Sequence, residues 1–261
     1  MASKDDPCCA AVIGLAVGLG LLYSGIQRYL LLQKINNTPT SKVRSAAVGL
    51  VELSGKALCR EPQLSPISGA KCIYWKIHEE YYQPGKHGGW RTTSSNFSHK
   101  DFYLEDDTGK MLVDPKDATI EIPSDFTSTG HLSSKGLLGI VPQRQLDPKV
   151  LAYLEGNPDA KGRAYRWSGY ELRFTEWFIA EGDPLYVLGN AEPQEGASSA
   201  IGFENLVVRQ GKYDKVFYIS DSGERKVVDS IRGSLYWQLG IGFVLAAICG
   251  YYIIYRMTGG T

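Results

Sequence analysis

The sequence predicts a mainly β protein, with a barrel- or sandwich-like soluble domain flanked by two transmembrane α-helices and one short internal helix. Both ends of the 261-residue chain are apolar, whereas short segments in the middle alternate between apolar and polar residues. Aromatic residues make up 11% of the chain, including 16 tyrosines, which is typical of strands. The 28 basic and 28 acidic side chains balance, which argues against a general nucleic-acid binder.

The first apolar segment, residues 8–26 (CCAAVIGLAVGLGLLYSGI), contains no charged side chain. It is long enough to cross the ~30 Å hydrocarbon layer as a helix. A lysine and two aspartates precede it and no small-x-small cleavage site follows it, so an uncleaved anchor is favoured over a signal peptide. We expect the helix to continue beyond the membrane and to end near Asn36 and Asn37, before Pro39.

The second apolar segment, residues 235–255 (LYWQLGIGFVLAAICGYYIIY), is also uncharged. Tyrosine or tryptophan lies at both of its ends, as expected where aromatic rings rest at the level of the headgroups. Its length and position favour a second membrane helix over a buried core helix.

Basic residues near the helix ends predict the orientation in the membrane. Four follow the first helix and three precede the second, on the central-domain side: Arg28, Lys34, Lys42, Arg44, Arg225, Lys226 and Arg232. Only Lys4 and Arg256 lie on the other sides. The central domain is therefore expected in the cytoplasm, with both short tails outside.

Four segments are predicted along the chain. They are an N-terminal tail and first helix (1–27), a juxtamembrane linker (28–44), a β-rich domain (45–232), and the second helix with a short tail (233–261). Strands are expected at 45–53, 71–82, 102–105, 110–114, 118–122, 171–179, 185–188, 206–209 and 216–219. In 71–82, Ile73, Trp75, Ile77 and Tyr81 share one face.

Hairpins and one helix are also predicted. The segment 102–114 (FYLEDDTGKMLVD) is similar to 217–229 (FYISDSGERKVVD), and both are expected to form hairpins. Asp147 as N-cap, Pro148 at the first position and Gly156 near the end predict a short helix that Pro158 stops. Loops are expected at 66–69, 84–89, 124–136 and 194–202. The apolar segment 133–141 fits either a surface contact loop or a strand entering the core, and the strand is favoured.

Two motifs suggest catalysis or metal binding, but each has a simpler interpretation. Asp107-Thr108-Gly109 and Asp221-Ser222-Gly223 are similar to the motifs of aspartic proteases, yet charged flanking residues favour hairpin turns. His78, His87 and His99 are irregularly spaced and lack an accompanying cysteine or acidic pattern, which favours ordinary histidines over a zinc site.

Cysteines and small residues suggest packing. Cys59 and Cys72 fit two small core residues better than a disulfide bridge. Small residues recur at four-residue spacing in both membrane helices, which fits either close helix contacts or the ordinary abundance of glycine in such helices. These residues are Ala10, Gly14, Gly18, Gly242, Ala246 and Gly250.

Segments 65–75 (SPISGAKCIYW) and 101–109 (DFYLEDDTG) resemble the GIDE family of membrane-anchored E3 ubiquitin ligases. Spaced matches carry the resemblance over about residues 8–255: Val113-Asp114-Pro115, Glu176, 181–183, 185–189 and 217–220. The resemblance implies a β-rich module beside the membrane that recognises substrates or partners.

In that family a zinc-binding RING domain follows the second helix, whereas here the residues after Tyr255 read RMTGGT. A RING domain binds two zinc ions with four Cys or His ligands each. Outside the membrane segments this chain offers only Cys59, Cys72 and four histidines, with no Cys-x-x-Cys pair. Prokaryotic relatives that keep the membrane module without the RING are the nearer comparison, so a prokaryotic cell membrane is expected.

The predicted function is therefore binding: a membrane-anchored scaffold that recruits partners or substrates. No catalytic, cofactor-binding or metal-ligating residue is predicted, and no cofactor. The expected partners are the lipid bilayer, protein clients and another copy through the helices, but not nucleic acid. The alternatives are a component of a ubiquitin-type ligase whose RING is on another chain, an unrecognised envelope enzyme, or a subunit of a transport or stress complex. A bare sheet edge would favour binding, and a deep cleft with perturbed titratable groups would favour an enzyme.

Overall fold

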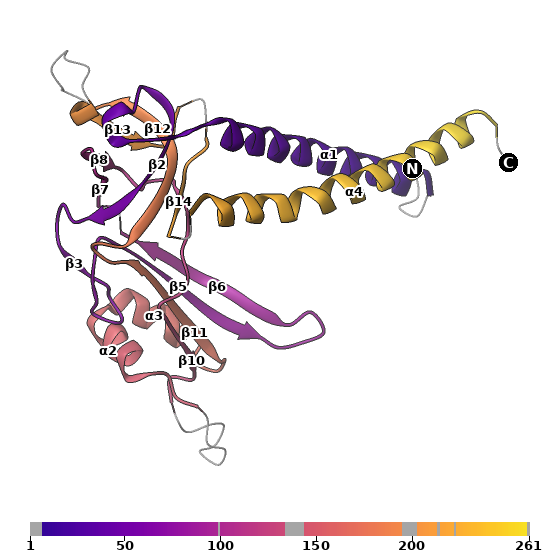
Figure 1. The fold of residues 1–261 in the computed structure, drawn as a ribbon. Coiled ribbons are helices and arrows are strands. Elements are labelled where there is room, and N and C mark those ends of the chain that lie inside the picture. The colour runs from indigo at the N-terminus through magenta and orange to yellow at the C-terminus, as the bar shows by residue number, and fades with distance from the viewer. Residues whose placement is uncertain are drawn as a thin grey trace. The chain divides into compact units, whose positions relative to one another are not determined.

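The computed structural model describes residues 7–98, 100–133, 144–194, 203–212, 215–221 and 223–259 (Figure 1). The chain forms two compact units. One combines Met1–Pro39 with Gly223–Thr261, and the other is Thr40–Ser222. The four segment boundaries expected from the sequence stay a prediction.

The first unit is a pair of long helices, α1 (Pro7–Asn37) and α4 (Gly223–Met257). Both are long and apolar enough to cross a membrane, over Cys9–Asn37 and Leu235–Met257. The predicted end of the first helix at Asn37 is confirmed. The second helix begins well before its apolar segment, so the hairpin expected at 217–229 is wrong: β14 (Tyr218–Ser220) leads into α4 instead. Apolar residues after Gly223 recur at helical spacing and continue the pattern of the membrane segment.

The second unit contains a closed five-stranded barrel, which confirms the barrel-like prediction. Its strands pair in the ring β2–β7–β8–β13–β12 and back to β2. Their bounds are β2 (Gly49–Leu58), β7 (Phe102–Glu105), β8 (Lys110–Val113), β12 (Pro184–Pro193) and β13 (Leu206–Arg209). Three short strands extend the ring: β1 (Thr40–Ser41) on β2, β14 on β12, and β9 (Thr119–Glu121) on β14. Fully buried apolar side chains fill the barrel, among them Leu53, Phe102, Met111, Val187 and Phe217.

A second sheet of four antiparallel strands has the order β10–β11–β5–β6. Its strands are β10 (Phe126–Gly130), β11 (Leu172–Ile179), β5 (Tyr74–Gln83) and β6 (Gly89–Phe97). Two helices, α2 (Pro148–Gly156) and α3 (Pro158–Arg166), cover one face, as Figure 1 shows. Ile77, Val150, Leu154 and Phe174 lie in the core between the helices and this sheet. A small pair, β3 (Gln63–Leu64) with β4 (Lys71–Cys72), completes the unit.

The predicted short helix is confirmed, because the Asp147 carboxylate accepts a hydrogen bond from the Lys149 amide at 2.9 Å. Pro158, expected to end structure there, instead begins α3. Asn157 caps that helix by accepting from the Ala160 amide at 3.1 Å. The missed signal is the Asn-Pro pair, since both residues suit a helix N-terminus.

Other differences follow from strand position. The strand expected at 45–53 is β2, beginning at Gly49 after a 3-10 turn at Val43–Ser45. The face expected for 71–82 is split, because Ile73 packs in the barrel while Ile77 packs under the helices. The loop expected at 124–136 contains β10, and the unpredicted β6 follows the turn at 84–89. The segments 194–202 and 133–141 lie almost entirely outside the described residues.

Candidate functional site

Strand β6 forms one edge of the four-stranded sheet, and within the described residues it pairs only with β5. It reads GWRTTSSNF, with neither the proline nor the lysine that often protects an edge. A bulge lies near its middle, where the Thr93 hydroxyl donates to the Glu79 carbonyl at 2.9 Å. The outer side of the nine-residue strand is therefore a bare sheet edge, the feature that favours binding.

A groove adjoins the second half of this edge. Its cavity measures about 480 Å³ and lies between β5, β6 and the start of α3. We call it the β6 groove. Its lining residues are Pro66, Trp75, Ser95, Asn96, Phe97, Tyr153, Asn157, Asp159 and Arg163.

A buried ion pair forms the floor of the β6 groove. Both Arg163 Nε and Nη2 donate to the Glu79 carboxylate at 2.7 Å, and the Tyr153 hydroxyl donates to the same carboxylate at 3.3 Å. The Glu79 side chain is only 3% exposed, so its charge depends on Arg163 for compensation. Burial, reinforced by Glu79, raises the pKa of Tyr153 to about 12, which keeps its hydroxyl protonated. The contacts among these three side chains give the floor of the groove a fixed polarity.

A second buried carboxylate positions one wall of the groove. Glu176, fully buried on β11, accepts hydrogen bonds from the amides of Ile67 and Ser68 at 2.8 and 3.0 Å. This holds the turn that begins at Pro66 against the sheet. Glu176 therefore has a structural partner on both carboxylate oxygens.

The sheet face opposite the helices carries cations stacked on aromatic rings. Lys76 Nζ lies 5.6 Å from the Trp177 ring centre, and His78 meets the same ring edge-on at 4.8 Å. Arg173 lies 4.2 Å from the Trp90 ring and pairs with Glu80 at 2.7 Å. Burial lowers the pKa of both Lys76 and His78. Aromatic rings and charged side chains thus contact each other on this face of the sheet, next to the edge strand β6.

The motifs with a protease or metal interpretation lie elsewhere. Asp106 supports the β7–β8 turn by accepting from the amides of Thr108 and Gly109 at 2.7 and 3.1 Å. Asp107 is 70% exposed, unlike a desolvated catalytic carboxylate. Asp221 follows β14 at the approach to α4, and Ser222 is not described.

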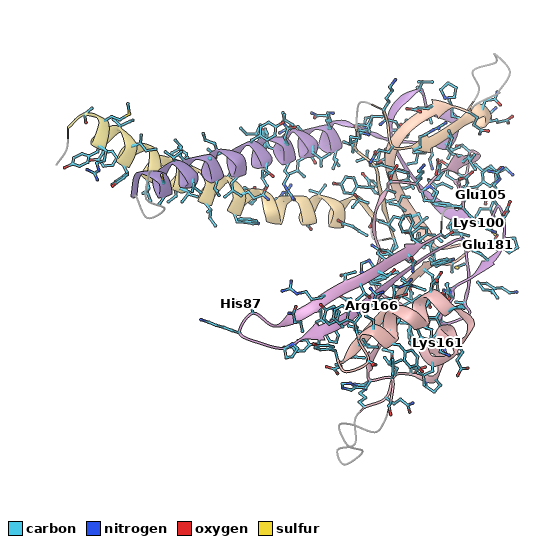
Figure 2. All side chains as sticks on the ribbon, turned by 180° about the vertical axis from the view of Figure 1, so that it is seen from behind. His87, Lys100, Glu105, Lys161, Arg166 and Glu181 are labelled. Carbon is cyan, nitrogen blue, oxygen red and sulfur yellow. The ribbon has the colours of Figure 1, made fainter. Side chains whose placement is uncertain are left out.

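The candidate histidines are not brought together as a metal site among the described residues. His78 lies within β5, whereas His87 lies in the turn at the tip of the β5–β6 hairpin, as Figure 2 shows. His99 is outside the described residues. The thiols of Cys59 and Cys72 are free, and burial raises both pKa values, that of Cys72 to about 11. A protonated thiol is a poor nucleophile.

In the helix pair, the small-residue stripes are contacts. A Cβ on Gly18 would lie 2.7 Å from the Ala246 backbone nitrogen, and one on Gly242 would lie 3.0 Å from the Gly18 carbonyl oxygen. Ser24 also donates to Gln238 at 3.3 Å between the two helices. Gly14 approaches Cys249, while Gly250 has only a loose contact with Leu15. The stripes thus let α1 and α4 pack closely within one chain.

The β6 groove could not be assigned from sequence, and the prediction that no site residue exists is not tested by the structure. Arg163 and Asp159 belong to α3, which the sequence interpretation missed, and Asn96 belongs to β6, also missed. The one available signal was the helix-start pattern at Asn157.

A β-barrel unit together with two helices long and apolar enough to cross a membrane defines a class of β-rich proteins with candidate membrane helices. The family model described as "GIDE: E3 Ubiquitin ligase" matches residues 76–250, about two thirds of the chain. The chain therefore belongs to the GIDE family, as the resemblance indicated. No curated protein and no solved structure matches it.

Proposed function

We propose that this chain is a membrane-anchored recruiting module, which binds protein partners or substrates on its β unit and holds them at the membrane. The β6 edge with its adjoining groove carries this proposal, because an unpaired edge and a pocket are the usual elements of peptide recognition. The buried polar groups of the groove, Glu79, Arg163 and Tyr153, are engaged with one another in an ion pair and hydrogen bonds, which favours binding over catalysis.

The cellular setting is part of the same proposal. The excess of lysine and arginine on the central-domain side of both helices supports a β unit on the cytoplasmic side of the membrane. The prokaryotic cell membrane in this proposal rests on the resemblance to prokaryotic relatives that keep the membrane module without the RING.

The family supports a second, related role as the recruiting part of a ubiquitin-type ligase whose zinc-binding RING is supplied by another domain or chain. Bound zinc and ubiquitin-chain formation by the purified chain test this directly, with activating and conjugating enzymes supplied. We expect no tightly bound zinc and no chain formation without an added RING. Two zinc ions bound per protein molecule, or ubiquitin-chain formation without an added RING protein, would contradict the proposal that the RING is supplied separately.

Photo-crosslinking in the native membrane tests recruitment. The full chain carries p-benzoylphenylalanine at Asn96 in the groove, or at the exposed positions Lys161 and Glu155 as comparisons. We expect protein adducts from Asn96 that reproduce between preparations and exceed those from the comparison positions. Adducts only at other positions would move the recruiting surface, and no protein adduct from any position on residues 40–222 would refute the recruiting role.

A further inference from the structure

We propose that the β6 edge binds an extended peptide segment as an added strand, and that a lysine or arginine of this segment enters the β6 groove. This rests on the proposed recruiting function and names the chemistry of its partner. The structure supplies two independent elements for such binding. One is an unpaired strand for backbone hydrogen bonds, and the other is a charged pocket for a side chain.

The pairing of β5 with β6 determines which side chains face the groove. Asn96 pairs with Ile77, which packs under the helices, whereas Phe97 pairs with Lys76 on the opposite face. Side chains directly opposite each other on paired strands point to the same face of a sheet. A residue placed opposite Asn96 on an added strand would therefore direct its side chain toward the helices, where the groove lies.

The charges of the groove favour a cation. Arg163 is neutralised by Glu79 beneath it, through two contacts of 2.7 Å. Asp159 is exposed at the start of α3, where it is attracted electrostatically to Arg163. Two carboxylates, Glu79 and Asp159, therefore share the single guanidinium of Arg163, which leaves this group with one negative charge in excess.

The walls of the groove also suit a long basic side chain. Trp75 lines it and packs against the core under the helices, on the face that carries the groove. Aromatic rings stabilise ammonium and guanidinium groups and pack against their methylene stems. Asn157 and Asn96 add polar groups at the rim.

Binding of a defined probe to the full chain in nanodiscs tests the proposal. The probe is a fluorescein-labelled heptapeptide, Thr-Val-Thr-Lys-Thr-Val-Thr, and its partner probe replaces lysine with glutamate. We expect saturable binding of the lysine peptide by fluorescence anisotropy, and binding of the glutamate peptide weaker by about tenfold at low salt. Equal affinity for both peptides would overturn the basic-side-chain assignment.

Backbone methylation of the probe tests strand addition without changing the protein. Successive N–H groups of a strand point to opposite edges, so two lysine peptides are N-methylated at alternate positions, one on each edge. Only one edge can pair with β6, so one methylated peptide should lose binding and the other should retain it. Any other pattern would overturn strand addition.

A matched pair of protein variants tests the pocket. Asp159→Lys should reverse the preference between the two peptides, whereas Glu155→Lys, an equal charge change on exposed α2, should not. Both positions are exposed, so both variants are expected to fold, which circular dichroism checks. An unchanged preference in Asp159→Lys would remove the groove from the proposal.

The remaining occupant of the edge would be a second copy of the chain. Mass photometry in nanodiscs or detergent tests this alternative. If the parent chain forms dimers that Ser95→Pro loses, and if neither peptide binds, β6 is assigned to self-pairing and the proposal is overturned. If neither peptide binds but crosslinks to a partner form on the β unit, the strand-addition proposal is wrong and the recruiting function is still supported. Absence of all such crosslinks removes the function itself.

Discussion

At the scale of single residues, the Glu79–Arg163 pair joins α3 to the four-stranded sheet through two hydrogen bonds. Glu79 is buried under α3 and Arg163 is its cationic partner. Arg163→Met leaves a buried carboxylate uncompensated, so we expect a loss of about 3 kcal/mol in the free energy of unfolding. Glu79→Gln in the same chain should restore part of that loss. Arg166→Met, on the exposed side of α3 (Figure 2), should change stability by less than about 0.5 kcal/mol. Urea unfolding of the full chain in detergent measures all three, and equal losses in Arg163→Met and Arg166→Met would contradict the argument.

His78 predicts a dependence of stability on pH. Burial, reinforced by Lys76 and opposed by Glu80, lowers its pKa from the ordinary value of 6.5. The unfolded chain therefore takes up a proton before the folded chain does, and the free energy of unfolding falls as the pH drops below about 6.5. His78→Gln should reduce this loss between pH 7.5 and 5, while His87→Gln, in the exposed turn, should not. Identical pH profiles for His78→Gln and the parent chain would refute the assignment.

Residue types alone could not predict the candidate site. Glu79, Arg163 and Asp159 are ordinary charged residues in the sequence, and only the packing of α3 on β5 gives them distinct roles. The turn interpretation of Asp107-Thr108-Gly109 was available from sequence, because Asp and Gly have local backbone preferences that need no tertiary contact.

At the scale of elements, the helix α2 was predicted correctly because its capping and stop residues are all present in the local sequence. Asp147 caps α2 through the Lys149 amide, so Asp147→Ala should cost about 1 kcal/mol of unfolding free energy. Asp147→Ser should retain most of this stability because a hydroxyl also accepts from the amide. The urea midpoint of the full chain in detergent measures the cost. A loss in Asp147→Ser as large as in Asp147→Ala would mean that the carboxylate acts through something other than capping.

Two of the missed elements, β6 and β10, are the edge strands of the four-stranded sheet. Both faces of β6 carry polar side chains (Thr, Ser, Asn), and β10 is similarly polar, so neither shows apolar alternation. Their pairing with β5 and β11 is decided by the neighbouring strand and not by their own pattern. The central strands β11 and β13 were predicted almost to the residue, because buried alternation or a short apolar run marks them.

The helix pair offers a test with an internal control. A Cβ on Gly18 would meet the backbone of α4, whereas nothing lies within 4 Å of a Cβ on Gly20. Gly18→Ala should therefore destabilise the helix pair by about 1 kcal/mol or more, and Gly20→Ala should not. The loss of helical circular dichroism as dodecyl sulfate is added to mixed micelles measures this. Equal midpoints for the two variants would show that the helices tolerate separation.

At the scale of the whole molecule, the helices are longer than a bilayer requires. α1 has 31 residues and α4 has 35, which correspond to about 46 and 52 Å at ~1.5 Å per residue. A hydrocarbon layer is ~30 Å thick, so about 11 residues of α1 and about 15 of α4 extend beyond it. β1 begins at Thr40 and β14 ends at Ser220, each a few residues from its helix. The β unit is thus tethered at both ends by short links, which suits a module that works at the membrane surface.

The last prediction concerns the orientation in the membrane and rests on charge asymmetry, because more lysine and arginine lie on the central-domain side of both helices. Single cysteines at Ser95 and Thr258, both exposed, report the two sides, with Cys8, Cys9 and Cys59 replaced. An impermeant thiol reagent should label only the cysteine at 258 in intact cells, and both after permeabilisation. Because the two helices enter the β unit from the same side of the membrane, the two reports must disagree in intact cells if both helices span it. Labelling at 95 alone would reverse the orientation, and labelling at both or at neither would mean that α4 does not cross.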